Sequence, residues 1–424
     1  MPIIESTRAV TRWTSRTIPV FLVGAVSYST YVLVGRVCSS YLINKRAELG
    51  PAIVILVLYF ILLLLMVGTY LRAVTTVIFD PGVVPLGPIA IEQRKREKEN
   101  RKHGYQGHIL ESRPYYDGSA DTNPDSPGLE HFYTKDVFVC QDDGKPKWCS
   151  ACSNWKPDRA HHSSEIDRCV LRMDHYCPWV GGMIGENSFK FFVQFTTYTA
   201  CYCAVVLGAA ASSLHKQINE GSQLDPHFIP VIVLASFFGL FTFLMTVTSV
   251  RYILLNMTNV DILGAQRKVH QLAVHVPRGT EATDKYAVIT YPLPKLEETN
   301  GRSNDTERPR SVESRGVSPQ PNRFSPSSRD DLAKRTFAIL KTEPGENPWD
   351  LGMWKNWQSV MGTNVLDWIL PFRRSPLVNH ESHESFYPLG KVLADMRARY
   401  NLNDLAVGNG AGLEMKEIRR GNRS

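Results

Sequence analysis

The chain has 424 residues, a formal net charge of +7 and eight cysteines. The mild positive excess is spread over the polar segments and no basic stripe is interleaved with aromatic residues, which disfavours a nucleic-acid-binding protein. Five of the cysteines lie in one polar stretch with the spacing of metal ligands, which argues against a secreted disulfide framework.

Four uncharged apolar runs define the class of the protein. Each has about 20 residues or more, enough to cross the hydrocarbon core of a bilayer at about 1.5 Å per residue. The first run is the most polar, and a cleaved signal peptide is its alternative interpretation. The sequence therefore predicts four transmembrane helices, over residues 17–35, 49–71, 191–214 and 228–250.

Basic residues in the short connections predict the orientation. Three arginines precede the first run and Arg72 follows the second, whereas the 215–227 loop carries only Lys216. The 36–48 loop also has three basic residues, so the imbalance is incomplete. The positive-inside rule still favours a cytosolic location for both termini and for the long 72–190 loop.

The polar segments differ in composition. Residues 92–102 are highly charged and predict a solvated helix, whereas 104–130 are rich in Gly, Pro, Asp and Ser and predict a loop. Residues 297–332 have the low complexity of a disordered segment. Four tryptophans within 346–371 are costly to expose, which predicts ordered packing on the membrane face or on the Cys/His-rich unit. The predicted boundaries are 1–16 (N-terminal segment), 17–71 (first two spans), 72–135 (linker), 136–190 (Cys/His-rich unit), 191–250 (last two spans) and 251–424 (C-terminal region).

The Cys/His-rich unit contains a metal-ligand pattern. Cys149 and Cys152 form a C-x2-C pair that lets both sulfurs reach one ion, and His162 and Cys169 follow within about 20 residues. Three thiolates and one imidazole suit tetrahedral zinc, and four protein ligands leave no position for water, which indicates a structural site. His161 is a neighbouring alternative ligand, and a set of buried cysteines without metal is the alternative to zinc.

The sequence MDHYC, residues 173–177, has the parts of a nucleophilic centre. A cysteine acts as a thiolate, and a nearby histidine lowers the pKa of such a thiol. His175 is the candidate base for Cys177, Asp174 is placed to hold the imidazole in one tautomer, and Pro178 favours a bend. The alternative is that Cys177 and His175 are further zinc ligands.

Residues 149–192 as a whole resemble the cysteine-rich domain of the DHHC-type protein S-acyltransferases, the palmitoyltransferases. The position of this stretch between the second and third spans fits the family, as does the sequence DPG at 80–82. The sequence TNVD at 258–261 is similar to the family's Thr-Thr-x-Glu motif, and NPWDLGMWKNWQSVMG from 347 resembles its C-terminal motif. The resemblance implies a membrane all-α fold with four transmembrane helices and a cytosolic zinc domain of short β-hairpins.

The chain departs from the family at one of two metal sites. The family binds two zinc ions, each through three cysteines and one histidine; the first set is complete here, whereas all four ligands of the second set are replaced. One structural zinc ion is therefore expected, and the pattern resembles the fungal DHYC branch without ankyrin repeats. The tyrosine in DHYC stands at a lost zinc-ligand position and not at the catalytic base. The replacing residues are Ser163, Ile166, Tyr176 and Met183.

The resemblance also implies a reaction. His175, oriented by Asp174, deprotonates Cys177, which takes the acyl group from palmitoyl-CoA and passes it to a cysteine of a cytosolic or membrane-anchored protein. Tyr202 aligns with the position that sets acyl-chain length, and a lipid-facing aromatic is its alternative role. CoA phosphates need cations, and ordinary surface charge is the alternative role of the candidates Lys156, Arg159, Arg168 and Arg172.

Two smaller departures affect single side chains. The family's asparagine before the third span would align with Ser188, whereas the asparagine here is Asn187. The second threonine of Thr-Thr-x-Glu becomes Asn259, and an asparagine side chain can replace the hydrogen bond that supports the catalytic aspartate.

Two other function classes remain as alternatives. A membrane adaptor or inactive enzyme with a one-zinc interaction module would explain the missing metal ligands, but not the retention of Asp174, His175 and Cys177. A transporter is disfavoured because the four spans lack paired ionisable residues at mid-depth. The expected location is an endomembrane or the plasma membrane, and the need for an accessory subunit is left open.

Overall fold

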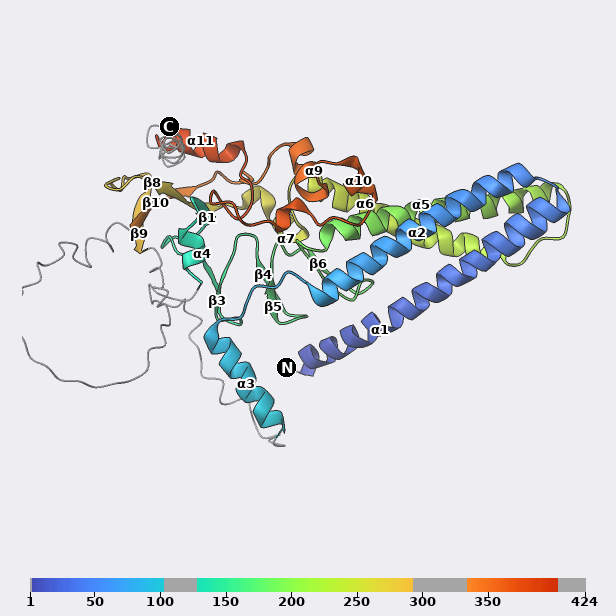
Figure 1. Ribbon diagram of the computed structural model, residues 1–424, viewed down its shortest axis with the longest axis horizontal. Coiled ribbons are helices and arrows are strands. Elements are labelled where there is room, and N and C mark those ends of the chain that lie inside the picture. Colours follow the sequence, from blue (N-terminus) through green and yellow to red (C-terminus); the bar gives the residue numbers. More distant parts are fainter. Residues whose placement is uncertain (1, 103–127, 293–333, 403–424) are drawn as a thin grey trace, which may run out of the picture.

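The computed structural model describes residues 2–102, 128–292 and 334–402 (Figure 1). The predicted disordered stretch 297–332 and nearly all of the predicted loop 104–130 lie outside these residues. Long helices form an elongated bundle, and the strands gather at one end of it (Figure 1). The predicted charged helix is present as α3, which projects from that end.

The four predicted transmembrane helices are confirmed. Helices long and apolar enough to cross a membrane cover Thr17–Lys45, Leu49–Phe79, Phe189–Asn219 and Phe228–Leu254. The first combines part of α1 (Pro2–Thr30) with η1 (Tyr31–Lys45), whose turns are wider than those of an α-helix. Leu33 of the first run and Cys38 just after it are buried against the other spans, so the first run packs as part of the bundle, which favours a span over the signal-peptide alternative. Large apolar side chains on the outer faces of α2 and α6 are exposed, as expected for helices surrounded by lipid.

The predicted short hairpins lie between α2 and α5. Three antiparallel pairs follow one another along the chain, β2 with β3, β4 with β5, and β6 with β7. Each strand has three residues, which gives too little pairing for independent stability. The hairpins therefore depend on metal ligation or on packing against the rest of the protein.

A four-stranded antiparallel sheet was not predicted, and the all-α fold class is correct only for the membrane part. The sheet has the order β1–β8–β10–β9, in which Val137 of β1 and Ala338 of β10 both pair with Val274 of β8. β1 comes from the Cys/His-rich stretch and the other three strands come from the C-terminal region. The sheet thus joins segments that are far apart in the chain, which no local pattern reveals.

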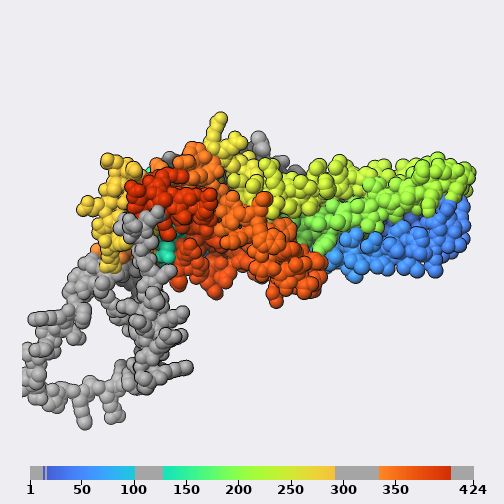
Figure 2. Space-filling model, turned by 90° about the horizontal axis from the view of Figure 1, so that it is seen from above, coloured from blue at the N-terminus to red at the C-terminus, as the bar shows by residue number. Residues whose placement is uncertain are grey.

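The C-terminal region returns to the bundle. Its helices α9 and α10 lie beside the ends of α5 and α6, and its orange and red surface covers the hairpin end of the molecule (Figures 1 and 2). One apolar core contains Cys177, residues of α2 and α5, and the C-terminal side chains Trp349 and Met361.

The elements have the bounds α1 Pro2–Thr30, η1 Tyr31–Lys45, α2 Leu49–Phe79, α3 Pro88–Lys102, α4 Glu130–Tyr133, β1 Val137–Val139, β2 Lys147–Cys149, β3 Asn154–Lys156, β4 His161–Ser163, β5 Arg168–Val170, β6 His175–Cys177, β7 Gly182–Ile184, α5 Phe189–Asn219, α6 Phe228–Leu254, α7 Asn259–Ile262, η2 Ala265–Arg267, β8 Gln271–Val276, β9 Ala287–Pro292, β10 Lys334–Lys341, α9 Met353–Met361, α10 Val365–Ile369, η3 Pro376–Val378 and α11 Lys391–Arg399.

Candidate functional site

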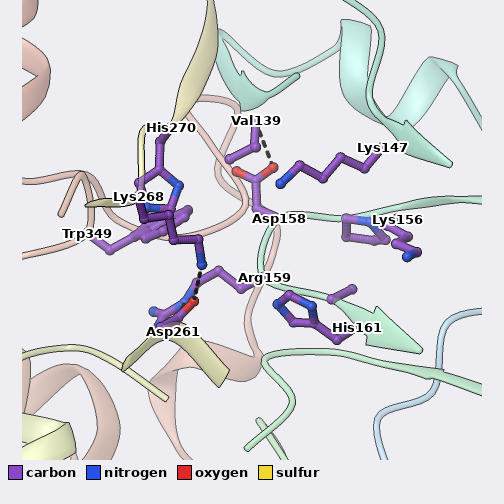
Figure 3. Close-up of a pocket in the computed structure, with 12 residues that line it drawn as sticks. Val139, Lys147, Lys156, Asp158, Arg159, His161, Asp261, Lys268, His270 and Trp349 are labelled. Atoms are coloured by element: carbon purple, nitrogen blue, oxygen red, sulfur yellow. Dashed lines mark hydrogen bonds and ion pairs between the residues drawn. The ribbon is translucent and has the colours of Figure 1, made fainter. Parts of the chain in front are cut away.

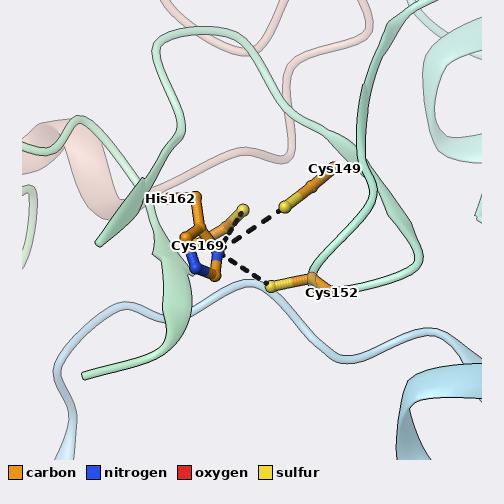
Figure 4. Close-up of side chains that lie close together, drawn as sticks. All are labelled: Cys149, Cys152, His162 and Cys169. Carbon is orange, nitrogen blue, oxygen red and sulfur yellow. Dashed lines mark hydrogen bonds between the residues drawn. The ribbon is translucent and has the colours of Figure 1, made fainter. Parts of the chain in front are cut away.

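The four predicted metal ligands converge at one point (Figure 4). Their ligand atoms all lie within 4.8 Å of one another. The Nδ1 atom of His162 is 3.5 Å from the Sγ of Cys149, 3.4 Å from that of Cys152 and 4.0 Å from that of Cys169. A tetrahedral zinc ion with its usual bond lengths would place nitrogen and sulfur ligands about 3.6 Å apart, so the donor set fits zinc in both chemistry and size.

Asp167 orients the His162 ring from the side opposite the cysteines. Its Nε2 atom faces the Oδ1 atom of Asp167 at 3.6 Å, and Arg94 of α3 donates to the carboxylate and to the main-chain oxygen of Asp167. A carboxylate behind a metal-binding histidine favours the tautomer whose other nitrogen is free for the metal. The alternative ligand His161 is turned away and lines a different pocket, so the interpretation of His161 as the ligand is wrong.

The positions of the second ligand set hold no second cluster. Across the described ranges, only Cys149 and its three partners bring together three or more metal-type ligands. Ser163 is buried and donates to Glu165, while Tyr176 and Met183 face each other across the β6–β7 hairpin. Cys177 and His175 belong to this hairpin and not to the metal cluster, so their interpretation as further zinc ligands is wrong.

The β6 strand places the two candidate reactive side chains on one face. Side chains alternate along a strand, so His175 and Cys177 point to the same side and Tyr176 points to the other. Cys177 is buried in the core that α2, α5 and the C-terminal region share. Tyr176, between them, therefore points away from the face that carries the two candidate reactive side chains.

Asp174 holds His175 in one orientation. The Nδ1 atom of His175 lies 2.7 Å from the Oδ2 atom of Asp174, whose side chain is 4% exposed. Burial alone would lower the pKa of His175, but the hydrogen bonds and negative charge of Asp174 and Cys177 outweigh it and raise that pKa to about 9. An Nδ1–H donated to Asp174 leaves Nε2 for the thiol, so this imidazole can take and hold the proton of Cys177.

The support of Asp174 comes from the main chain of Asn259. The Asn259 N–H donates to the Oδ1 atom of Asp174 at 2.9 Å, whereas the Asn259 side chain accepts from Tyr252. The expected side-chain bond from Asn259 to the aspartate is therefore wrong. Because a backbone N–H makes this contact, the threonine-to-asparagine departure leaves it unchanged. Thr258 and Asp261 cap the short α7 helix reciprocally and hold this N–H in place.

Two of the four candidate CoA-binding cations are buried and bound to other parts of the chain. Arg159 is buried, forms an ion pair with Asp261 at 2.7 Å and donates to Asn256. Arg172 is 2% exposed and donates to the same Asn256 side chain. Both guanidinium groups hold internal partners, as buried charges require, and their assignment to CoA phosphates stays a prediction.

The other two candidates are accessible to different degrees. Arg168 is half-buried and donates to the main-chain oxygen of Val84. Lys156 lines a pocket beside the Arg159–Asp261 pair, where Lys147 and Lys268 join it (Figure 3). These lysines come from β3, β2 and the segment before β8, and their convergence was not predicted because no spacing along the chain relates them.

The pocket also holds a buried carboxyl group. Asp158 accepts a hydrogen bond from the Val139 N–H at 2.9 Å, and desolvation raises the pKa of Asp158 to about 7 (Figure 3). Burial lowers the pKa of His270 and that of His161 to about 4, so both rings stay neutral at physiological pH. The positive charges in the pocket therefore belong to Lys147, Lys156, Lys268 and Arg159, of which the last two pair with Asp261.

Tyr202 lies inside the helix bundle. It is 5% exposed, and its hydroxyl is 3.0 Å from that of Tyr59, which also contacts the Thr30 hydroxyl at 2.6 Å. The alternative of a lipid-facing aromatic is therefore wrong. The three groups form a polar layer across an otherwise apolar core.

The residues just before α5 connect the hairpins to the end of the second span. The Asn187 side chain donates to the main-chain oxygen and to the Oδ1 atom of Asp80, which follows α2. The Ser188 hydroxyl accepts from the Gly185 N–H instead. Asn187 therefore makes the connection between the second span and the hairpins, and Ser188 caps the local turn.

Comparison with known proteins agrees with this site. Residues 142–266 match the model of the family described as DHHC palmitoyltransferase. The chain is 37% identical to palmitoyltransferase pfa5 of Aspergillus fumigatus, over 92% of this chain and 90% of the relative. It is 36% identical to palmitoyltransferase pfa5 of Emericella nidulans, over 96% and 87% of the two chains. Palmitoyltransferase PFA3 of Saccharomyces cerevisiae is 29% identical over 58% of this chain and 57% of the relative.

Proposed function

The chain belongs to the DHHC palmitoyltransferase family, and on this basis we propose that it is a protein S-palmitoyltransferase that works through an acyl-cysteine on Cys177. The observation that carries the mechanism is the 2.7 Å contact of Asp174 with His175, which lies two residues before Cys177 on strand β6. Retention of this pair beside a lost metal site supports an enzyme over an adaptor.

In the first step His175 takes the proton of Cys177. The thiolate attacks the thioester carbon of a long-chain acyl-CoA, the carbon–sulfur bond to CoA breaks, and the CoA thiolate leaves with the proton that His175 held. The raised pKa of His175 makes it a stronger base for the first transfer. The products are free CoA and the Cys177 thioester.

In the second step a cysteine of a protein substrate attacks the Cys177 thioester. His175 removes the proton of the incoming thiol and returns it to Cys177 when the new thioester has formed. The scheme requires CoA to leave before the protein is acylated, which is the order of a ping-pong reaction.

The acyl donor contacts two parts of the protein, the lysine-lined pocket and the helix bundle. The phosphates of CoA are bound by Lys156 together with Lys147, since phosphate groups attract such cations, whereas Lys268 in the same pocket donates to Asp261 at 3.4 Å. Each buried CH2 contributes about 0.8 kcal/mol, so a C16 chain favours the interior of the helix bundle. The polar layer of Tyr59 and Tyr202 limits its depth. Tyr202→Ala should therefore shift the preferred donor toward longer chains in a competition assay.

The metal cluster has a structural role in this proposal. Cys149, Cys152, His162 and Cys169 hold one zinc ion, which cross-links β2 to the β4–β5 hairpin. The closed ligand set leaves no position for a substrate. The reaction centre and both termini lie on the cytosolic side, as the positive-inside rule favours for an endomembrane or plasma-membrane protein.

The test is labelling of the purified protein with an alkynyl palmitoyl-CoA, followed by hydroxylamine. Wild type should carry a hydroxylamine-sensitive label that Cys177→Ser loses completely, while Cys201→Ser, which changes an exposed cysteine of α5, keeps it. Both variants should retain the same zinc content and elute as folded protein. A thioester label that persists in Cys177→Ser would overturn the assignment, and no label on zinc-loaded wild type would favour the adaptor or a missing partner subunit.

A further inference from the structure

The segment from α9 to residue 372 exposes large apolar side chains next to the helix bundle. Trp354 is 61% exposed, Leu366 is 59% exposed and Phe372 is 75% exposed. Met353, Val365 and Ile369 are exposed around them. Apolar surface of this kind is uncommon where a protein faces only water, and it marks a contact with a membrane or a partner. We name these six residues the apolar face.

The depth of the apolar face follows from its bonds to a spanning helix. The Gln194 side chain donates to the main-chain oxygens of Asp367 and Trp368, and the Tyr198 hydroxyl donates to that of Ile369. Gln194 and Tyr198 lie in the second and third turns of α5, which starts at Phe189. The carboxyl end of α10 is therefore fixed beside the first three turns of α5, one of the four helices able to span a membrane.

The underside of the same segment is packed on the protein. Trp368 contacts the rings of Trp354 and Trp357, and Val360 and Met361 belong to the core that contains Cys177. The Asn356 side chain donates to the main-chain oxygen of Leu254 at the end of α6. The outward apolar face is thus held rigidly and is not the result of a loose end.

Charge on the segment matches a lipid surface. Arg373, whose side chain is 75% exposed, follows the apolar face directly, and exposed Lys355 lies within α9. Apolar and aromatic side chains flanked by cations are typical of segments that lie in the interface of a bilayer with anionic lipid. From this continuity with the spanning helices, we propose that the apolar face is seated in the cytosolic leaflet as a membrane anchor separate from the four spans.

A seated anchor would fix the distance between Cys177 and the membrane. Val360 and Met361 of the segment that carries the apolar face share one core with Cys177, so seating of the apolar face sets how far Cys177 lies from the lipid. This role differs from acyl transfer itself, because the anchor contacts lipid whether or not Cys177 reacts. It can therefore be tested without an activity assay.

The test uses spin labels on the protein in nanodiscs that contain anionic lipid. Cys201→Ala removes the exposed native cysteine of α5 and Cys177→Ser removes the proposed nucleophile, and Leu366→Cys or Phe372→Cys then carries the nitroxide. Collisions with oxygen, which concentrates in the bilayer, should exceed those with a water-soluble nickel complex at both positions. Lys391→Cys on α11, an exposed residue away from the bundle, is the control and should show the reverse order.

A second measurement needs no new cysteine. Lipids brominated near the headgroup should quench the fluorescence of wild type more than that of Trp354→Phe. The proposal is overturned if the labels at 366 and 372 respond like Lys391→Cys. It is also overturned if both positions are shielded from oxygen and from nickel, since a second copy of the chain or another protein would then cover the apolar face.

Discussion

The two halves of the hairpin region are held in different ways. The half from β2 to β5 is cross-linked by the four metal ligands, whereas the half formed by β6 and β7 has no such cluster among the residues that the structure describes. The second half is instead enclosed by other parts of the chain. Trp179 packs on Phe238 and Phe241 of α6, and Tyr70 of α2 donates to its main-chain oxygen.

This difference shows that short hairpins can be supported either by metal ligands or by packing. A metal fixes short strands through local ligands, whereas packing requires segments from distant parts of the sequence. The half formed by β6 and β7 contains His175 and Cys177, and Asp174 directly precedes it, so the proposed reaction centre depends on tertiary contacts. We expect the two halves to respond differently to metal removal, to packing changes and to pH.

Metal removal should have the largest effect. Structural zinc contributes about 10–16 kcal/mol to the folding of small zinc domains, so Cys169→Ser should release the metal and open the half from β2 to β5. Hydrogen exchange should rise strongly over 149–169 and far less over 175–184. Cys201→Ser is the control with an intact cluster, and wild type should contain about one zinc ion per chain. An equal rise in both halves would show that the metal supports the entire region.

A packing change should affect the half without metal. A Cβ atom added at Gly182 would lie 2.3 Å from the Cγ1 atom of Val77, so Gly182→Ala forces β7 away from α2. Overpacking of this kind costs about 1–3 kcal/mol. The midpoint of thermal denaturation in detergent should fall, together with the rate of Cys177 acylation.

Two variants separate this clash from a general effect of substitution. In a Val77→Ala background the clashing atom is absent, so the added cost of Gly182→Ala should shrink. Gly208→Ala places its Cβ in open space and should leave stability nearly unchanged. If Gly182→Ala proved as harmless as Gly208→Ala, close packing of β7 on α2 would not be what supports this half.

The smallest expected effect concerns the hydrogen bonds that join Glu186, two residues after β7, to His380 and Tyr387 of the C-terminal region, here called the clasp. Glu186 is buried and accepts from Tyr387 and from the Nε2 atom of His380, which lies at 2.8 Å. The Nδ1 atom of His380 faces the Phe386 main-chain oxygen at 2.9 Å, so both ring nitrogens face acceptors and the charged ring satisfies both. Burial alone and nearby Lys135 lower the pKa of His380, but the hydrogen bond and charge of Glu186 and the Phe386 oxygen outweigh them and raise it.

The sign of the pH effect follows from this raised pKa. The clasp stabilises the protein fully below the unfolded-state pKa of histidine, about 6.5, and loses this contribution as pH rises through the higher folded-state pKa of His380. The loss is on the order of 1 kcal/mol, seen as a fall of the denaturation midpoint. His380→Asn should reduce the fall of the denaturation midpoint with rising pH, and the raised pKa of His175 still contributes to what remains, whereas exposed His383→Asn should keep the wild-type profile. An unchanged profile in His380→Asn would assign the pH dependence to another group.

Local features of the molecule could be predicted, and contacts between distant segments could not. The spans follow from uncharged runs, and the metal ligands and the Asp174–His175 pair follow from short spacings. Strands β8 and β10 were missed because they become a sheet only by pairing with each other and with β1. Lys147 and Lys268 were missed for the same reason, since only the fold brings them to Lys156.

The sequence by itself therefore determined the membrane class, the single complete ligand set and the order of the reactive residues. Each of these depends on side chains that are neighbours in the chain. The tertiary structure decided which charges are free to meet a ligand. Arg159 looks like a phosphate ligand in the sequence, yet it is buried against Asp261, 102 positions away. A buried charge requires a partner, and only folding determines which partner comes within reach.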